Sequence, residues 1–203
     1  VDDIVHVIDE EAEDDLMKLA GLGESDLYGR VFATAKSRAT WLTVNLGTAV
    51  LASLVIGLFE ATLSQAVALA VLMPLVASMG GNAGMQTLTV AVRALAMKDR
   101  SASNALRFIG KECAVGLSNG VVFAVMTGVV AWLWFGRVDI GVIIGLAMIV
   151  NMLVAGLSGT LVPLVLEKLK IDPAVASALF LTTITDVGGF FAFLGPAALL
   201  FLW

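Results

Sequence analysis

The chain has 203 residues, of which 59% are hydrophobic and 14% are charged, and its formal net charge is −5. This apolar composition indicates a membrane protein, and the sequence has no basic patch of the kind that nucleic acid requires. The single cysteine, Cys113, and the single histidine, His6, exclude a disulfide framework, a cysteine metal cluster and a histidine-pair zinc site.

Ten of the seventeen acidic residues lie in the first 26 positions, which separates an acidic head from an apolar remainder. Apolar residues recur at helical spacing over 1–22, and acids crowd the other faces of that helix: Asp9, Glu10, Glu11, Glu13, Asp14 and Asp15. This run is either a solvated acidic helix or part of a divalent-cation site completed by acids from elsewhere, since Mg²⁺ and Ca²⁺ prefer carboxylate oxygens. Because the chain begins at Val1 rather than Met, we expect it to be part of a longer protein.

Residues 26–40 carry Arg30, Lys36 and Arg38, and they predict an interfacial helix that leads into the bilayer. Apolar segments long enough to cross a bilayer follow, at a rise of about 1.5 Å per residue. We place these five segments at 39–59, 63–95, 113–135, 140–166 and 174–203.

The second segment is longer than a hydrocarbon core of about 30 Å requires. It contains Pro74 and then the string Gly80-Gly81-Asn82-Ala83-Gly84-Met85-Gln86. Such a string predicts a bent or thinned helix with exposed carbonyls. Irregular backbone at membrane depth is tolerated only where protein or a watery cavity covers it.

Small and polar residues in the apolar segments predict how the helices pack. Gly116-x-x-x-Gly120 and Gly141-x-x-x-Gly145 allow close approach of two helices. The side chains of Asn45, Asn119 and Asn151 can form hydrogen bonds between helices. We interpret these features as packing rather than function.

The last segment, 174–203, contains one charged residue, Asp186. A carboxylate at a membrane helix centre costs about 2.5–3.5 kcal/mol, and this segment has no Lys, Arg or His to pair with it. Thr182 and Thr183 precede Asp186 by one helical turn and Gly189 follows it by one turn, so the four residues share a face. That face suits an ion path; the alternative is that Asp186 ends a short helix near the interface.

The basic residues predict the orientation in the membrane. Of the twelve Lys and Arg, eleven lie in the head, in the connection 93–111 or in the turn 168–170, and only Arg137 lies on the opposite side. The positive-inside rule therefore places the N-terminus in the cytoplasm and, after five spans, the C-terminus outside.

One aspartate has too little charge to hold a divalent ion by itself. A homodimer with its two-fold axis along the pore would present two copies of Asp186 to one ion. Mg²⁺ gives up its waters reluctantly and is commonly held by one or two carboxylates. Two Asp186 carboxylates and the carbonyls near Thr182 therefore match hydrated Mg²⁺ better than a Ca²⁺ cage.

The string from Pro74 to Gln86 resembles the PxxxxxGGNxGxQ signature of the MgtE family of magnesium channels. Asp172-Pro173 followed by Thr185-Asp186 resembles the last segment of that family. The resemblance covers nearly the whole chain. It implies an all-α membrane protein with five transmembrane helices per chain, assembled as a homodimer with a pore at the two-fold axis, in a bacterial inner membrane.

The resemblance also implies a domain plan and partners. Residues 1–8 would be the tail of a cytosolic CBS domain, 9–22 an acidic plug helix, 23–38 an amphipathic connection and 39–203 the pore domain. Cytosolic N and CBS domains of a full-length chain, a second copy and the lipid bilayer would be the partners. The bound ion would be Mg²⁺, with Mn²⁺, Co²⁺ or Ca²⁺ as surrogates.

From the residue patterns and the resemblance together, we expect two sets of site residues. The metal-binding set is Asp186, Thr182, Asn82, Asp172, Asp9, Glu10, Glu11 and Asp14. The set that lines the pore or breaks a helix is Pro74, Gly80, Gly81, Gly84, Gln86, Thr183, Thr185 and Gly189.

We therefore expect a Mg²⁺-selective channel for divalent cation influx, gated in the full protein by cytosolic Mg²⁺. The alternative is a proton- or sodium-coupled exchanger, although five segments do not divide into the two equal halves of an inverted repeat. An enzyme is not expected, because an intramembrane aspartyl protease needs two membrane aspartates and only Asp186 qualifies.

Overall fold

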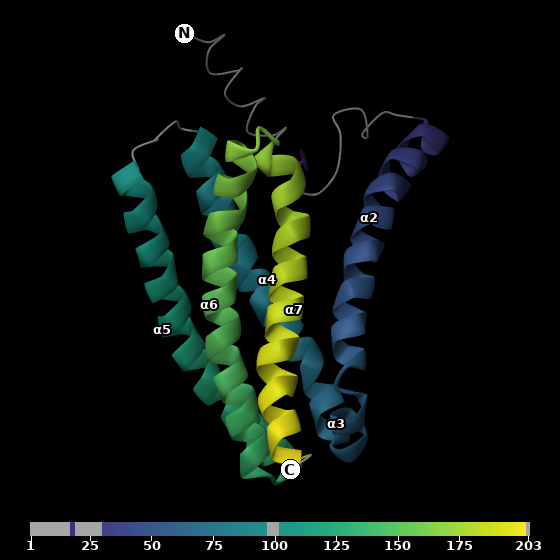
Figure 1. Cartoon of the computed structure of the whole chain (residues 1–203), viewed down its shortest axis with the longest axis vertical. Helices are drawn as coiled ribbons and strands as arrows, with labels where there is room; N and C mark the ends of the chain where they lie inside the picture. The colour runs from purple at the N-terminus through teal and green to yellow at the C-terminus, as the bar shows by residue number, and fades with distance from the viewer. Residues whose placement is uncertain (1–16, 19–29, 97–101, 202–203) are drawn as a thin grey trace.

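The computed structural model describes residues 17–18, 30–96 and 102–201, and the bundle that they form is drawn in Figure 1. Five helices in this part are long and apolar enough to cross a membrane. They are α2 (Val31–Gly57), α4 (Val67–Ala96), α5 (Ala102–Phe135), α6 (Val138–Lys168) and α7 (Pro173–Phe201). A short helix, α3 (Glu60–Gln65), joins α2 to α4, and no strand occurs in the described residues. The prediction of an all-α membrane protein with five spans is confirmed.

The first span begins earlier than its apolar pattern suggests. The described part of the predicted interfacial helix, 30–40, does not form a separate element, because α2 runs unbroken from Val31. No Gly or Pro occurs between Val31 and Leu46, so nothing in this sequence stops the helix at the bilayer boundary. The interfacial position predicted for 26–40 stays a prediction, and in the described part this stretch is continuous with the first span.

A helix break in the second segment is not observed, while the predicted bend stays a prediction. Helix α4 is continuous from Val67 to Ala96 and includes Pro74 and the whole glycine string. The helix starts after Ala66, where φ is −137° and ψ is 84° and the chain turns from α3 into α4. Side chains of neighbouring helices pack against Gly80 and Gly84 within α4.

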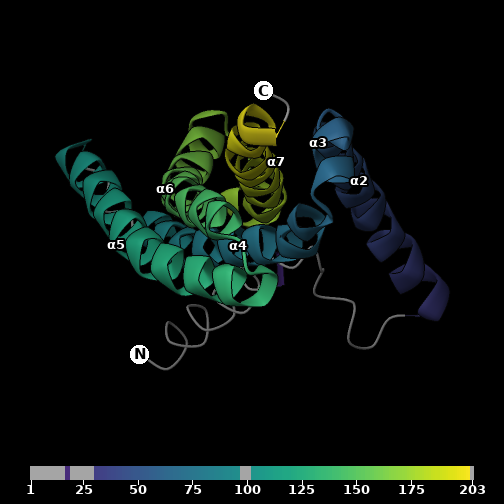
Figure 2. The ribbon, with the colours of Figure 1, turned by 90° about the horizontal axis from the view of Figure 1, so that it is seen from below.

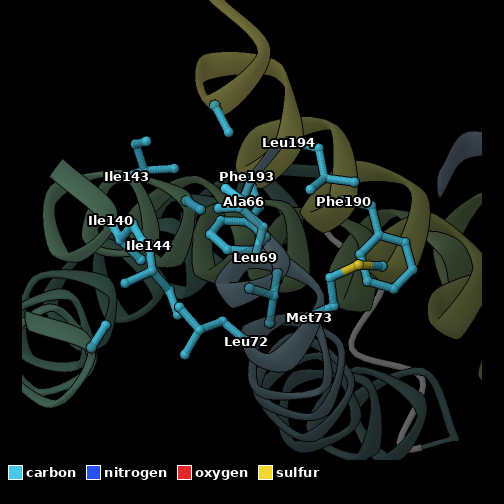
Figure 3. Close-up of a cluster of buried hydrophobic side chains, with 14 of the residues drawn as sticks. Ala66, Leu69, Leu72, Met73, Ile140, Ile143, Ile144, Phe190, Phe193 and Leu194 are labelled. Carbon is cyan, nitrogen blue, oxygen red and sulfur yellow. The ribbon is translucent and has the colours of Figure 1, made fainter. Parts of the chain in front are cut away.

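Helix α6 lies at the centre of the bundle and packs against α4, α5 and α7, while α2 lies at the side next to α7 (Figures 1 and 2). Buried side chains of α4, α6 and α7 form the main apolar core. Leu72 and Ile144 are fully buried, and so is Phe193, which lies among the labelled side chains of Figure 3. This core fixes α7, the helix that carries Asp186.

The helices cross the bundle in alternating directions. The start of α2, the end of α4, the start of α5 and the α6–α7 turn lie at one end, and α3 and the α5–α6 turn lie at the other (Figure 1). Arg93 in the last turn of α4 and Lys168 in the last turn of α6 therefore belong to the first end. Arg137, which precedes α6, belongs to the opposite end.

Asn151 in the middle of α6 joins three helices. Its side chain is fully buried, and its Nδ2 donates a hydrogen bond to the carbonyl of Val76 in α4 at 2.6 Å. A Cβ atom on Gly80 would lie 2.6 Å from the Oδ1 of Asn151, and one on Gly189 would lie 2.9 Å from the same oxygen. The predicted interhelical role of Asn151 is confirmed, and it depends on a glycine on each side.

The paired glycines of α5 and α6 do bring these helices together. A Cβ on Gly116 would lie 2.7 Å from the carbonyl oxygen of Met152, and one on Gly141 would lie 2.6 Å from that of Gly128. Backbone therefore packs on backbone along this pair, which is the arrangement that small residues permit in membranes.

We expect Gly80→Ala to destabilise the fold and Gly81→Ala to leave it unchanged. The added methyl at position 80 overlaps the Asn151 side chain, and overpacking of this kind costs about 1–3 kcal/mol. The methyl at position 81 meets nothing within 4 Å, so that neighbouring variant is the control. Thermal unfolding of the detergent-solubilised chain measures the difference, and equal midpoints for the two variants would contradict the role of Asn151.

Candidate functional site

Helix α7 carries the candidate site, and its sequence defines where it begins. Pro173 is the first helical residue, a position that proline favours because its missing N–H would have no partner there. Asp172 precedes it and caps the helix, since its Oδ1 accepts a hydrogen bond from the backbone N–H of Ala174 at 2.9 Å. The cap fixes α7 at the end that also holds Arg93 and Lys168.

Asp186 lies three and a half turns further along α7 and is partly buried. Within the described residues, no group of three or more His, Cys, Asp or Glu side chains comes together. The carboxylate of Asp186 is therefore a single charge on an apolar helix rather than a member of an acidic cluster in this chain.

The threonines near Asp186 are engaged with their own helix. The hydroxyls of Thr182 and Thr183 donate to the carbonyls of Ala178 and Leu179, each at 2.9 Å. Thr185 is fully buried, and its hydroxyl donates to the carbonyls of Leu181 at 3.1 Å and Thr182 at 3.0 Å. The carbonyl of Thr182 accepts the Thr185 hydroxyl in addition to the backbone N–H one turn further along the helix, so both of its lone pairs are engaged.

The glycines expected along the pore divide into two kinds. Gly80, Gly84 and Gly189 are packing positions, since a Cβ on Gly84 would lie 2.7 Å from the Leu181 side chain and Gly80 and Gly189 enclose Asn151. Gly81 has open space beside it. Asn82, next to it, is exposed, and its Nδ2 lies 3.5 Å from the Ser78 hydroxyl. Gly81 and Asn82 thus form a free surface of α4.

The remaining predicted residues lie elsewhere. Pro74 is exposed on α4, and Gln86 borders a cavity between α4, α5 and α6. Asp172 forms an ion pair with Lys18, with Nζ and Oδ2 3.6 Å apart, which places one residue of the segment 9–22 against the α6–α7 turn. Four of the predicted ligands lie outside the described residues: Asp9, Glu10, Glu11 and Asp14.

The sequence analysis missed one buried acid, Glu112. The apolar pattern predicted a third segment from Cys113, but α5 begins at Ala102, and the Glu112 side chain is only 7% exposed. The signal that could have found it is spacing, because Glu112, Gly116 and Gly120 are four residues apart and share the helix face that packs on α6.

The comparisons with known proteins identify the family. The family model described as "MgtE: Divalent cation transporter" matches residues 73–196, which include the glycine string of α4 and Asp186 of α7. The chain belongs to the MgtE family. The resemblance noted from the two motifs is confirmed.

Three relatives are similar over most of this chain, and each is named magnesium transporter MgtE. The protein of Enterococcus faecalis is 40% identical over 187 residues, covering 92% of this chain and 41% of the relative. The protein of Bacillus subtilis is 33% identical over 198 residues, covering 97% of this chain and 44% of the relative. The protein of Thermus thermophilus is 32% identical over 204 residues, covering 98% of this chain and 45% of the relative. The chain thus spans less than half the length of these relatives.

We expect Asp172→Ala to lower the stability of the bundle by about 0.5–2 kcal/mol, because it removes the cap of α7. Asp172→Asn should have little effect, because an asparagine oxygen also caps a helix and an exposed ion pair such as Lys18–Asp172 contributes about 0–1 kcal/mol. Thermal unfolding of both variants measures this. If Asp172→Asn lowers the midpoint as much as Asp172→Ala, the ion pair rather than the cap stabilises the turn.

Proposed function

We propose that this chain is the ion-conducting membrane domain of a Mg²⁺ channel, and that Asp186 binds the ion as it passes. The observation that carries the proposal is the partly buried carboxylate of Asp186, the only charge in 174–203, on a helix fixed by the core and by Asn151. The family description and the names of the three relatives support a divalent cation, and Mg²⁺ in particular, as the transported ion.

The proposed mechanism is electrostatic. A single carboxylate leaves a divalent ion with an uncompensated positive charge in an apolar region, which is costly. Two copies of the chain around a two-fold axis bring two Asp186 carboxylates to one ion and cancel its charge. Because Mg²⁺ keeps several waters, the exposed residues Thr182 and Asn82 are proposed to act on its hydration shell.

The proposed orientation places the end of the bundle with Arg93 and Lys168 in the cytoplasm of a bacterial cell. Most basic residues belong to this end, which agrees with the positive-inside rule. With the C-terminus outside, Mg²⁺ would enter the cell down its electrochemical gradient, since a negative interior attracts cations.

Gating by cytosolic Mg²⁺ follows from the acids at this end. The ammonium of Lys18 now faces the carboxylate of Asp172, and a Mg²⁺ ion shared between Asp172 and the head acids would compete with that ammonium. The ion would favour whichever conformation brings the acids together, because it binds that conformation more tightly.

Asp186→Asn should reduce Mg²⁺ flux into vesicles by roughly tenfold or more, because a charge-assisted contact is worth about 1.5–3 kcal/mol and the amide keeps the size but removes the charge. Asn82→Ala should reduce flux less, since it removes a neutral group. Glu60→Gln, an exposed carboxylate in α3, is the control and should conduct normally. Wild-type flux from a folded Asp186→Asn protein would refute the proposal, and equal losses in Asp186→Asn and Asn82→Ala would remove its electrostatic basis.

The 203 residues by themselves should respond only weakly to millimolar Mg²⁺ on the cytoplasmic side. The closed arrangement is proposed to need carboxylates of N and CBS domains, and its differential affinity for the ion is lost without them. Vesicle flux of this chain and of a version extended by those domains, with cytoplasmic Mg²⁺ raised stepwise, measures the difference. Equally sharp closure of both proteins would place the sensor within these 203 residues.

A further inference from the structure

A cavity with both apolar and polar walls lies between α4, α5 and α6, and no described residue of α7 lines it. Its volume is about 130 Å³, which is room for an ion with bound water. The polar side chains on its wall are those of Gln86, Thr87, Glu112 and Asn119. Because Asp186 lies on α7, this cavity is separate from the proposed ion path.

Glu112 is the charged group of this cavity. It lies six residues after Leu106, where the third candidate span begins, in a stretch that also carries Arg107 and Lys111. Its Oε2 accepts a hydrogen bond from the hydroxyl of Thr87 at 2.9 Å. Thr87 is unlike Thr182, Thr183 and Thr185, whose hydroxyls donate to carbonyls of their own helix.

Glycines on α5 and α6 build the cavity wall. A Cβ on Gly159 would lie 2.9 Å from the Cβ of Thr87, and one on Gly156 would lie 2.9 Å from the carbonyl oxygen of Glu112. A Cβ on Gly116 would lie 2.7 Å from the carbonyl oxygen of Met152. These close contacts hold the Thr87 hydroxyl and the Glu112 carboxylate together.

Two further oxygen donors border the cavity without partners. They are the side-chain amides of Gln86 and Asn119, which form no hydrogen bond with any described residue. Both residues are exposed in this chain, so water or a ligand can reach their amides. A carboxylate, a hydroxyl and two amide oxygens are the hard donors that suit an alkali or alkaline-earth cation.

Charge decides between these two classes of cation. The ammonium of Lys111 is largely exposed and lies 3.8 Å from Oε1 of Glu112, so a positive charge already stands beside the carboxylate. A monovalent cation that takes the place of the Lys111 ammonium beside the carboxylate neutralises Glu112, while the exposed ammonium turns to solvent. A divalent cation leaves a net positive charge within an apolar span and next to Lys111, which is unfavourable.

We propose that this cavity is a binding site for a small monovalent cation, with Glu112 and Thr87 as its central ligands and the amides of Gln86 and Asn119 beside them. The ammonium of Lys111 competes with the bound cation for the same carboxylate. The bound cation stabilises the contact of α4 with α5, since Thr87 and Glu112 belong to these two helices.

The test is direct binding of radiolabelled Na⁺ to the purified 203-residue chain in detergent, at constant ionic strength with choline as the replacement cation. Wild type should bind Na⁺ saturably, and Na⁺ should raise its Tm relative to choline, because a ligand of the native state stabilises it. Glu112→Gln should lose both effects, while Glu60→Gln, an exposed acid outside the cavity, should keep both.

Lys111→Met gives a second, independent readout. The side chain is exposed, so its loss should not disturb packing, and the Na⁺ concentration for half-maximal binding should fall severalfold because the competing ammonium is gone. An unchanged half-maximal concentration overturns the proposal, and it does so even if Glu112→Gln does not fold.

Further outcomes of the binding and Tm measurements would also overturn the proposal. Saturable binding of Na⁺ that persists in Glu112→Gln overturns the proposed ligands. A Tm that responds equally to Na⁺ and choline, with no saturable binding, means that the cavity holds water only. Displacement of Na⁺ by equimolar Mg²⁺ in both wild type and Glu60→Gln, or a Glu112-dependent Tm shift with Mg²⁺ alone, overturns the monovalent class.

Discussion

The packing of Asn151 between Gly80 and Gly189 is the constraint on which the rest of the bundle depends. Helices in a membrane gain little from burying apolar surface against one another, because lipid is as apolar as the protein core. Close backbone approach and interhelical hydrogen bonds must therefore hold them. Asn151 supplies a hydrogen bond to the Val76 carbonyl, and the two glycines let α4 and α7 approach it from opposite sides. The glycine string and Asp186 are thereby held at fixed positions on one frame.

This constraint changes the meaning of the glycine string in α4. Three glycines within 80–84 suggest a weak helix, yet α4 stays helical, and neighbouring side chains fill the space beside two of them: Asn151 at Gly80 and Leu181 at Gly84. Gly81 and Asn82 have no such neighbour in one copy of the chain, and they present α4 backbone and an amide at an exposed surface. A surface of this kind is available to a second copy or to a passing ion, which agrees with the proposed pore.

Two carboxylates within the spans have opposite surroundings. Asp186 has no recorded hydrogen bond or ion pair in the described part of the chain, whereas Glu112 has the Thr87 hydroxyl and the Lys111 ammonium. Helix α6 lies between α5 and α7 and packs against both, so each carboxylate is positioned by a different face of the same central helix. An unpaired carboxylate suits transient binding of a passing cation, and a paired one suits a resident ligand.

The sequence by itself determined the fold class and the number of spans and singled out Asp186 as a candidate, because each rests on a property of one segment. Segment length and apolarity identify a span, and a lone carboxylate in 174–203 is visible without any neighbour. Only the tertiary structure decided that α4 is unbroken, that Gly80 and Gly189 enclose Asn151, and that Glu112 is buried against Thr87. The physical reason is that these three features depend on which helices contact each other. Hydropathy does not predict helix partners in a membrane, because lipid covers an apolar helix face as well as another helix does.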